Sequence, residues 1–168
     1  MSTPAISILG TGKVAYNMAA VLSEKTNILQ VIGRNESKLE KFQIDFGIES
    51  AKLDDPLRPT DILIICISDD AISEVVQRIA PRLSKECIVC HTSGTQPLDA
   101  ILEFWPHAGI FYPLQTFTED RTVDFKKIPL LITSASSFIE KTLINLASII
   151  SDNVLTISDD HRKDKNIH

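Results

Sequence analysis

The stretch AISILGTGKVA, residues 5–15, combines the end of a strand, a glycine turn and the start of a helix. The apolar run stops at Gly10, and apolar residues then recur at helical spacing as far as Leu22. Gly10 allows a tight bend, Gly12 lets backbone N–H groups approach a pyrophosphate, and Ala15 lets the helix pack close to the strand. Because a helix N-terminus favours an anion, this G-x-G-x-x-A pattern predicts a dinucleotide-binding turn. An ordinary strand–helix turn is the alternative interpretation.

The composition is that of a globular protein with one domain. The chain has 168 residues, of which 43% are hydrophobic and 23% charged, enough to bury a full core. A net charge of −5 disfavours nucleic acid and anionic membranes as partners, since both would repel the protein. No segment reaches transmembrane length, and the first strand leaves no room for a cleavable leader, so we expect a cytoplasmic protein.

The three cysteines, Cys66, Cys87 and Cys90, all fall in apolar, strand-like runs. Cys87 and Cys90 have the C-x-x-C spacing of a redox or zinc motif. In a strand, however, residues three apart point to opposite faces, so the pattern favours buried free thiols. The four histidines show no ligand spacing with each other or with cysteine, and no metal site is predicted.

Strand-like and helical segments alternate along the whole chain. We expect strands at 5–9, 28–32, 47–52, 61–67, 87–90, 109–112, 130–133 and 154–157, with helices between them, the last of these capped by Ser137. This alternation predicts an α/β fold: a doubly wound, mostly parallel sheet of about eight strands with a helical layer on each face, which is Rossmann-like. Such sheets bind ligands at the carboxyl ends of their strands.

The second strand ends about 20 residues beyond the glycine turn, where an NAD-binding fold usually has an acidic residue for the adenosine ribose. This chain has Gly33 there, followed by Arg34, with Ser37 and Lys38 nearby. A carboxylate would repel a ribose 2′-phosphate, whereas a guanidinium beside a hydroxyl and a helix N-terminus would bind one. The pattern predicts a preference for NADP(H). A solvated Arg34 is the alternative, and Asn35 is expected to cap the next helix.

Polar loops follow the fourth and fifth strands, and we expect them to line the nicotinamide end of the site. One of Asp69 and Asp70 should also cap the next helix. A histidine after a strand could donate a proton to a nascent alkoxide or amine, although a hydrogen-bonded structural histidine is the commoner case. Ser93 and Gly94 are expected to form part of a backbone cradle. The candidates at this end are Ser68, Asp69, His91, Ser93, Gly94 and Gln115.

Four segments together resemble a known family: residues 10–15 (GTGKVA), 65–72 (ICISDDAI), 91–94 (HTSG) and 112–117 (YPLQTF). The chain resembles the Rossmann-like NADP oxidoreductases that carry a second, helical domain of unknown function. These are relatives of pyrroline-5-carboxylate reductase, the β-hydroxyacid dehydrogenases and the deazaflavin-dependent NADP reductases. The resemblance covers nearly the whole chain, with Tyr112 where the family often has histidine.

The resemblance implies a two-domain organisation. Residues 1–157 correspond to the NADP-binding domain. Residues 158–168 resemble the start of an interdomain helix, capped by Ser158, that leads to a C-terminal helical domain absent from this sequence. In the family this second domain usually dimerises and closes the substrate pocket, so a homodimer is expected for the full-length protein. A solvated, charged tail is the alternative for residues 158–168.

The sequence therefore predicts an NADP(H)-dependent oxidoreductase that acts on a small-molecule substrate once joined to its C-terminal domain, with NADP as cofactor. A non-catalytic NADP-binding or sensor module is the alternative. A site for S-adenosylmethionine is a third hypothesis, which is disfavoured because Arg34 stands in place of an acidic ribose ligand. His91 is the candidate catalytic residue. The expected cofactor-binding residues are Gly10, Thr11, Gly12, Lys13, Val14, Arg34, Asn35, Ser37, Lys38, Ser68, Asp69, Asp70, His91, Ser93 and Gly94.

Overall fold

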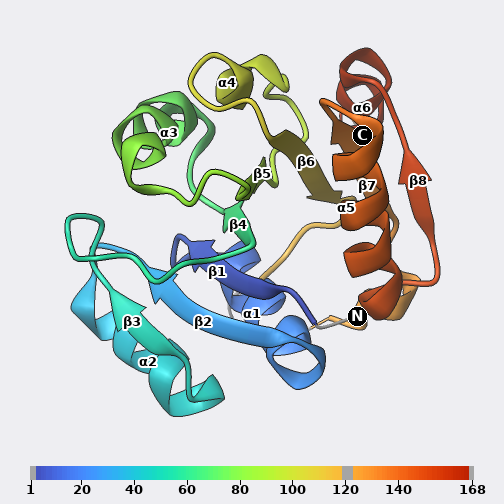
Figure 1. The fold of residues 1–168 in the computed structure, drawn as a ribbon. Helices are drawn as coiled ribbons and strands as arrows, with labels where there is room; N and C mark the ends of the chain where they lie inside the picture. Colours follow the sequence, from blue (N-terminus) through green and yellow to red (C-terminus); the bar gives the residue numbers. More distant parts are fainter. Residues whose placement is uncertain (1–2, 119–122, 167–168) are drawn as a thin grey trace.

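The strands form one sheet in the order β3-β2-β1-β4-β5-β6-β7-β8 in the computed structural model, which describes residues 3–118 and 123–166 (Figure 1). Neighbouring strands are parallel except for β6 and β7, which are antiparallel. This confirms a mostly parallel sheet of eight strands. The strands are β1 (Ala5–Leu9), β2 (Asn27–Ile32), β3 (Glu49–Ala51), β4 (Ile62–Ile65), β5 (Ile88–His91), β6 (Ala108–Pro113), β7 (Leu130–Ser134) and β8 (Val154–Thr156).

Helices cover both faces of the sheet, which gives the expected three layers (Figure 1). Helices α1, α2 and α5 pack on one face, and α3 and α4 pack on the other. The helices are α1 (Lys13–Lys25), α2 (Glu36–Phe46), α3 (Ile72–Ile79), α4 (Asp99–Leu102), α5 (Ser137–Ile150) and α6 (Asp159–Asn166). Short 3-10 turns lie at Asp69–Ala71, Ala80–Arg82 and Phe125–Lys127.

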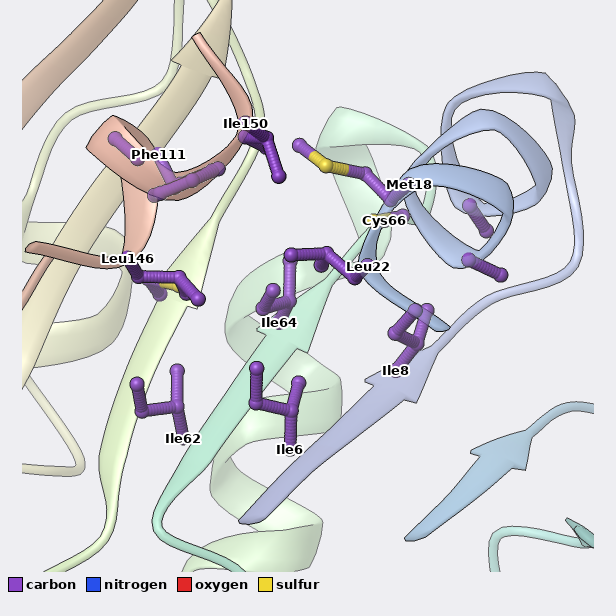
Figure 2. Close-up of a cluster of buried hydrophobic side chains, with 14 of the residues drawn as sticks. Ile6, Ile8, Met18, Leu22, Ile62, Ile64, Cys66, Phe111, Leu146 and Ile150 are labelled. Carbon is purple, nitrogen blue, oxygen red and sulfur yellow. The ribbon is translucent and has the colours of Figure 1, made fainter. Parts of the chain in front are cut away.

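Isoleucines at alternate positions of β1 and β4 build the core beneath α1 and α5. Side chains two residues apart in a strand point to the same face, so Ile6 and Ile8 lie beside Ile62 and Ile64. Figure 2 shows these four side chains facing the two helices, which contribute Met18, Leu22, Leu146 and Ile150. Each fully buried side chain of this size contributes about 1.5–3 kcal/mol.

Strand β4 is buried on both faces, as its uninterrupted apolar run predicts. Leu63 and Ile65 face the opposite side from Ile62 and Ile64 and pack with the helix α3. The switch in strand order falls between β1 and β4, since the chain first builds outward to β3 and then returns to pair β4 with β1. A doubly wound sheet opens a crevice at that point, at the carboxyl ends of its strands.

Several local expectations are confirmed and two are corrected. Asn35 caps α2, because its side chain accepts a hydrogen bond from the N–H of Lys38 at 3.1 Å. The cap of α5 is Ser136 rather than Ser137, and its hydroxyl accepts from the N–H of Ile139 at 3.3 Å. No aspartate caps α3: a 3-10 turn over Asp69–Ala71 precedes that helix and supplies its first turn.

The three cysteines are free and buried, as expected. Removal from water raises the pKa of the Cys66 and Cys87 thiols to about 12 and holds the pKa of Cys90 well above its usual value. The sulfurs therefore remain protonated and unreactive in the folded protein.

Helix α6 packs against the domain instead of forming a solvated tail over residues 158–166. The hydroxyl of Ser158 accepts the N–H of His161 at 3.3 Å, which confirms Ser158 as its cap, and Arg162 is fully buried. Residues 167 and 168 of the expected interdomain helix lie outside the described residues. Among the helices that the structure describes, none combines the length and the apolar character needed to cross a membrane.

Candidate functional site

The turn between β1 and α1 is shaped by two glycines with different surroundings. Gly10 has a φ of 124°, and its N–H donates to the carbonyl of Ile32 at 2.8 Å. A Cβ on Gly10 would overlap the backbone carbonyl of Cys66, so a side chain cannot be accommodated there. Gly12 has φ −83° and ψ −164°, which any residue can adopt, and apart from Gly12 itself and its chain neighbours no heavy atom lies within 4 Å of where its Cβ would be. Gly12 therefore keeps space open.

The N-terminus of α1 faces this open space without an internal counter-charge. Gly12 is the N-cap residue, no side chain caps the helix, and its first turn carries no acidic residue. The unpaired N–H groups and the helix dipole thus present a partial positive charge to the space in front of the turn. Such an end is suited to binding an anion.

The segment after β2 adds cations to the same space. Gly33 is packed against this turn, since a Cβ on it would lie 2.6 Å from Cγ2 of Thr11. Arg34, Asn35 and Lys38 follow, and all three are exposed. The only carboxylate between β2 and the second turn of α2, Glu36, forms an ion pair with Lys52 at 2.6 Å.

The loops after β4 and β5 complete the edge of the sheet and are joined to each other. The hydroxyl of Thr95 donates to Asp69 Oδ2 at 2.7 Å, which connects the two loops. Ser93 Oγ accepts the backbone N–H groups of Thr95 and Gln96 at 3.1 and 3.0 Å, so it closes a tight turn within its own loop. The backbone cradle expected around Ser93 and Gly94 stays a prediction.

These four segments enclose one open cavity of about 990 Å³ at the carboxyl ends of β1, β2, β4 and β5. That volume is in the range of cofactor sites. Of the expected binding residues it is lined by Gly10, Thr11, Gly12, Lys13, Val14, Arg34, Asn35, Lys38, Ser68, Asp69, Ser93 and Gly94.

Three of the four cations that line the cavity have no carboxylate partner among the described residues, and the fourth, Arg78, pairs with Asp54. Lys41, Lys52, Arg58 and Arg78 each pair with an acidic side chain. Lys13, Arg34 and Lys38 line the cavity and have no ion-pair partner within residues 3–118 and 123–166. Unpaired charge concentrated at a helix N-terminus favours an anionic ligand.

His91 does not reach the cavity. Its ring is fully buried, its Nδ1 accepts the N–H of Ser93 at 3.0 Å, and its Nε2 lies 3.2 Å from the carbonyl oxygen of Pro97. These partners require the neutral tautomer with the proton on Nε2. Burial lowers the pKa of His91 to about 4, so the ring stays neutral near pH 7. The geometry is that of a hydrogen-bonded structural histidine, and we therefore do not propose His91 as a proton donor or as a cofactor contact.

Three other expected residues lie outside the cavity lining. Ser37 and Asp70 are exposed, and Gln115 is exposed and donates to the carbonyl of Thr116 at 3.4 Å. The sequence interpretation also missed residues that do line the cavity. Thr92 and Thr95 belong to the same polar run as Ser93 and could have been included; Glu74, Val75 and Arg78 come from α3, whose face toward the cavity no motif indicates. Within the described residues, no group of three or more potential ligand side chains could hold a metal ion.

Comparisons with known proteins place this site in a family context. The family model described as NADP oxidoreductase, coenzyme F420-dependent, matches residues 5–94, which span β1 to the loop after β5. That segment contributes every residue lining the cavity except Thr95. A search among curated proteins found no match.

Solved structures share the fold over nearly the whole chain. A Bacteroides fragilis protein, provisionally named an NADP oxidoreductase, is 30% identical with a TM-score of 0.93; the alignment covers 98% of this chain and 64% of that one. Prephenate dehydrogenase from A. aeolicus, solved with hydroxyphenyl propionate and NAD+, is 14% identical with a TM-score of 0.82, covering 96% and 62%. Arogenate dehydrogenase from Synechocystis is 18% identical with a TM-score of 0.79, covering 94% and 61%. This chain thus spans less than two thirds of the length of each.

Proposed function

Because the chain belongs to the family of coenzyme F420-dependent NADP oxidoreductases, we propose that it binds NADP(H) and forms the nucleotide-binding domain of an NADP(H)-dependent oxidoreductase. One observation carries the proposal: the cavity joins a helix N-terminus that has no acidic first turn to Lys13, Arg34 and Lys38, which have no ion-pair partner in the part of the chain that the structure describes. A dinucleotide phosphate carries negative charge at the diphosphate and at the ribose 2′-phosphate, so it matches both features.

The diphosphate would lie against the turn formed by Gly10, Thr11, Gly12, Lys13 and Val14. Backbone N–H groups at the start of α1 would donate to its oxygens, and the open space beside Gly12 would allow that approach. The adenosine end would then lie beside Arg34, Asn35 and Lys38, with the guanidinium of Arg34 paired to the 2′-phosphate.

The nicotinamide end would lie along Ser68, Asp69, Ser93 and Gly94. When bound, the nicotinamide supplies the hydride chemistry, and the protein's task is to orient it and keep water away. The hydrogen bond from Thr95 to Asp69 holds the two loops at a fixed separation. His91 would support this end of the site indirectly, because its Nδ1 accepts the backbone N–H of Ser93.

The preference for NADP(H) is tested by titrating the protein with NADPH and NADH while following nicotinamide fluorescence. Arg34→Ala should weaken NADPH binding by about 1.5–3 kcal/mol, the value of a hydrogen bond to a charged group, and leave NADH almost unchanged. Arg58→Ala is the matched control, since Arg58 is an exposed arginine that pairs with Glu49 outside the cavity. Equal binding of NADPH and NADH by the unaltered protein would contradict the proposed 2′-phosphate site.

The activity of the whole protein extends the proposal. We propose that α6 leads into a helical domain that completes the site for a small-molecule substrate and forms a homodimer, because this chain spans only 61–64% of the similar solved chains. The chain of residues 1–168 should then bind NADPH without turning over carbonyl or imine substrates. Reduction of such a substrate at an ordinary rate by this chain alone would contradict the proposal.

A non-catalytic NADP-binding module is the second candidate. The observation that favours it is that no histidine lines the part of the cavity that the structure describes. The two functions differ in one measurement: a full-length protein that binds NADPH but oxidises none of it with any carbonyl or imine substrate would be a binding module.

A further inference from the structure

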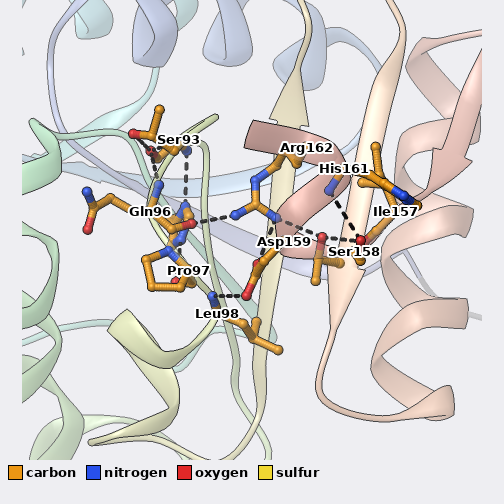
Figure 3. A network of polar contacts seen from close by, with 12 residues as sticks. Ser93, Gln96, Pro97, Leu98, Ile157, Ser158, Asp159, His161 and Arg162 are labelled. Atoms are coloured by element: carbon orange, nitrogen blue, oxygen red, sulfur yellow. Dashed lines mark hydrogen bonds and ion pairs between the residues drawn. The ribbon is translucent and has the colours of Figure 1, made fainter. Parts of the chain in front are cut away.

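Arg162 on α6 is a charged side chain buried at the junction of three segments far apart in the sequence. Its guanidinium is completely shielded from solvent. Nη2 donates to the carbonyl of Gln96 at 2.5 Å (Figure 3). Nη1 donates to Thr133 Oγ1 at 2.9 Å. Nη1 also lies 3.0 Å from Asp159 Oδ1, one turn earlier on the same helix.

Asp159 adds a second connection from α6 to the same loop. Its Oδ2 accepts the backbone N–H of Leu98 at 3.3 Å, two residues beyond the carbonyl that Arg162 binds (Figure 3). Helix α6 is therefore held to residues 96–98 by two side chains that also form an ion pair. Burial of a guanidinium is costly, and the Nε of Arg162 is buried with no hydrogen-bond partner among the described residues, so an apolar side chain would pack α6 at lower cost. The polar contacts of the Arg162 guanidinium, more than the volume of the side chain, therefore explain why an arginine is buried at this junction.

The loop held by α6 is also the loop that lines the cavity. Residues 92–95 face the cavity, and residues 96–98 face α6. A continuous series of hydrogen bonds joins the two halves: the N–H of Gln96 donates to Ser93 Oγ at 3.0 Å, and the N–H of Ser93 donates to His91 Nδ1 at 3.0 Å. Movement of Gln96 would therefore disturb the turn around Ser93.

We propose that Arg162 and Asp159 are positioning residues, which hold the loop of residues 92–98 in the shape that receives the nicotinamide half of the cofactor. This inference rests on the proposed binding of NADP(H). Neither residue lines the cavity, so both act through the loop. Because coupling between two sites is reciprocal, a cofactor that contacts the loop strengthens the docking of α6 in return. The helix that leads to the next part of the chain thereby responds to cofactor binding.

The direct test compares two ligands in the variant Arg162→Met. NADPH contacts both ends of the cavity, whereas adenosine 2′,5′-bisphosphate carries only the adenosine end. The variant should bind NADPH about tenfold more weakly, since ordering about one released loop residue on binding costs roughly that factor. Its affinity for the bisphosphate should not change. Arg58→Met, outside the cavity and the network, should bind both ligands as the unaltered protein does.

A purely structural role for Arg162 would lower both affinities together, and no role would leave both unchanged; either result overturns the inference. If Arg162→Met does not fold, amide hydrogen exchange in the unaltered protein decides. NADPH should slow exchange in residues 92–98 and in α6, and the bisphosphate should leave α6 unchanged. Equal exchange of α6 with and without NADPH overturns the inference while the proposed function stands. Failure of the unaltered protein to bind either ligand overturns the proposed function, and the inference with it.

Discussion

Alanine at Gly10 should mainly destabilise the fold, whereas alanine at Gly12 should mainly weaken ligand binding, although only one residue separates the two positions. At Gly10 the φ of 124° disfavours a side chain, and the new methyl group would overlap the carbonyl of Cys66. That carbonyl belongs to the chain just after β4, which pairs with β1, so relief requires the two central strands to separate. At Gly12 the backbone is ordinary and the space around the methyl is open.

The magnitudes follow from these surroundings. Backbone strain of this kind costs about 1–3 kcal/mol, and the overlap with a main-chain atom adds to it, so Gly10→Ala should destabilise the fold by about 3 kcal/mol. For Gly12→Ala, the loss of a preferred N-cap residue lowers the free energy of unfolding, whereas the reduced freedom of the unfolded chain raises it. The net change in the free energy of unfolding should stay within about 1 kcal/mol. The Gly12 methyl would instead stand where the diphosphate approaches the N–H groups, weakening NADPH binding about tenfold or more.

Urea unfolding followed by circular dichroism measures the first effect, and calorimetric titration with NADPH measures the second. Gly10→Ala should lower the urea midpoint by about 1 M or more, given the usual slopes for domains of this size. Gly12→Ala should keep the midpoint close to that of the unaltered protein. Unaltered NADPH affinity in Gly12→Ala would refute the placement of the diphosphate, and an unaltered midpoint in Gly10→Ala would refute the account of the turn.

Two further predictions concern buried titratable groups. Burial lowers the pKa of His91 from 6.5 to about 4, so below pH 6.5 the unfolded chain takes up a proton that the folded protein does not. Between pH 6.5 and 4 this group should therefore lower the free energy of unfolding by about 3 kcal/mol. In urea unfolding measured over this pH range, His91→Gln should remove that part of the pH dependence. Burial raises the pKa of Cys66 and Cys87 to about 12 and that of Cys90 well above its usual value, so an aromatic disulfide reagent at pH 8 should label the three thiols rapidly in urea and slowly in buffer. Rapid labelling of any thiol in the folded protein would show that the burial is transient.

The sequence was most informative where a local pattern has a local cause. The glycine turn, the strand positions and the caps at Asn35 and Ser158 depend on residues within a few positions of each other, and the structure confirms them. The direction of β7 was not predictable in this way, because alternation and apolar runs are the same for parallel and antiparallel strands.

Candidate site residues followed the same division. Segments directly after strands were identified correctly as the cavity edge, since parallel strands bring their carboxyl ends together. The role of His91 depends on the direction in which its ring points, which the sequence does not indicate. In the structure the ring is buried at the end of β5, with Nε2 beside the carbonyl oxygen of Pro97. The burial of Arg162 was not predictable from the charged terminal segment in which it lies, because its partner Gln96 lies 66 residues away along the chain.

The unpaired Lys13, Arg34 and Lys38 form a small electropositive area on a protein whose net charge is −5. Before a nucleotide binds, mobile anions from the buffer gather over these side chains, and a bound nucleotide must displace them. Added salt therefore competes with the nucleotide at this edge of the sheet, so affinities for NADPH are comparable only between solutions of the same ionic strength.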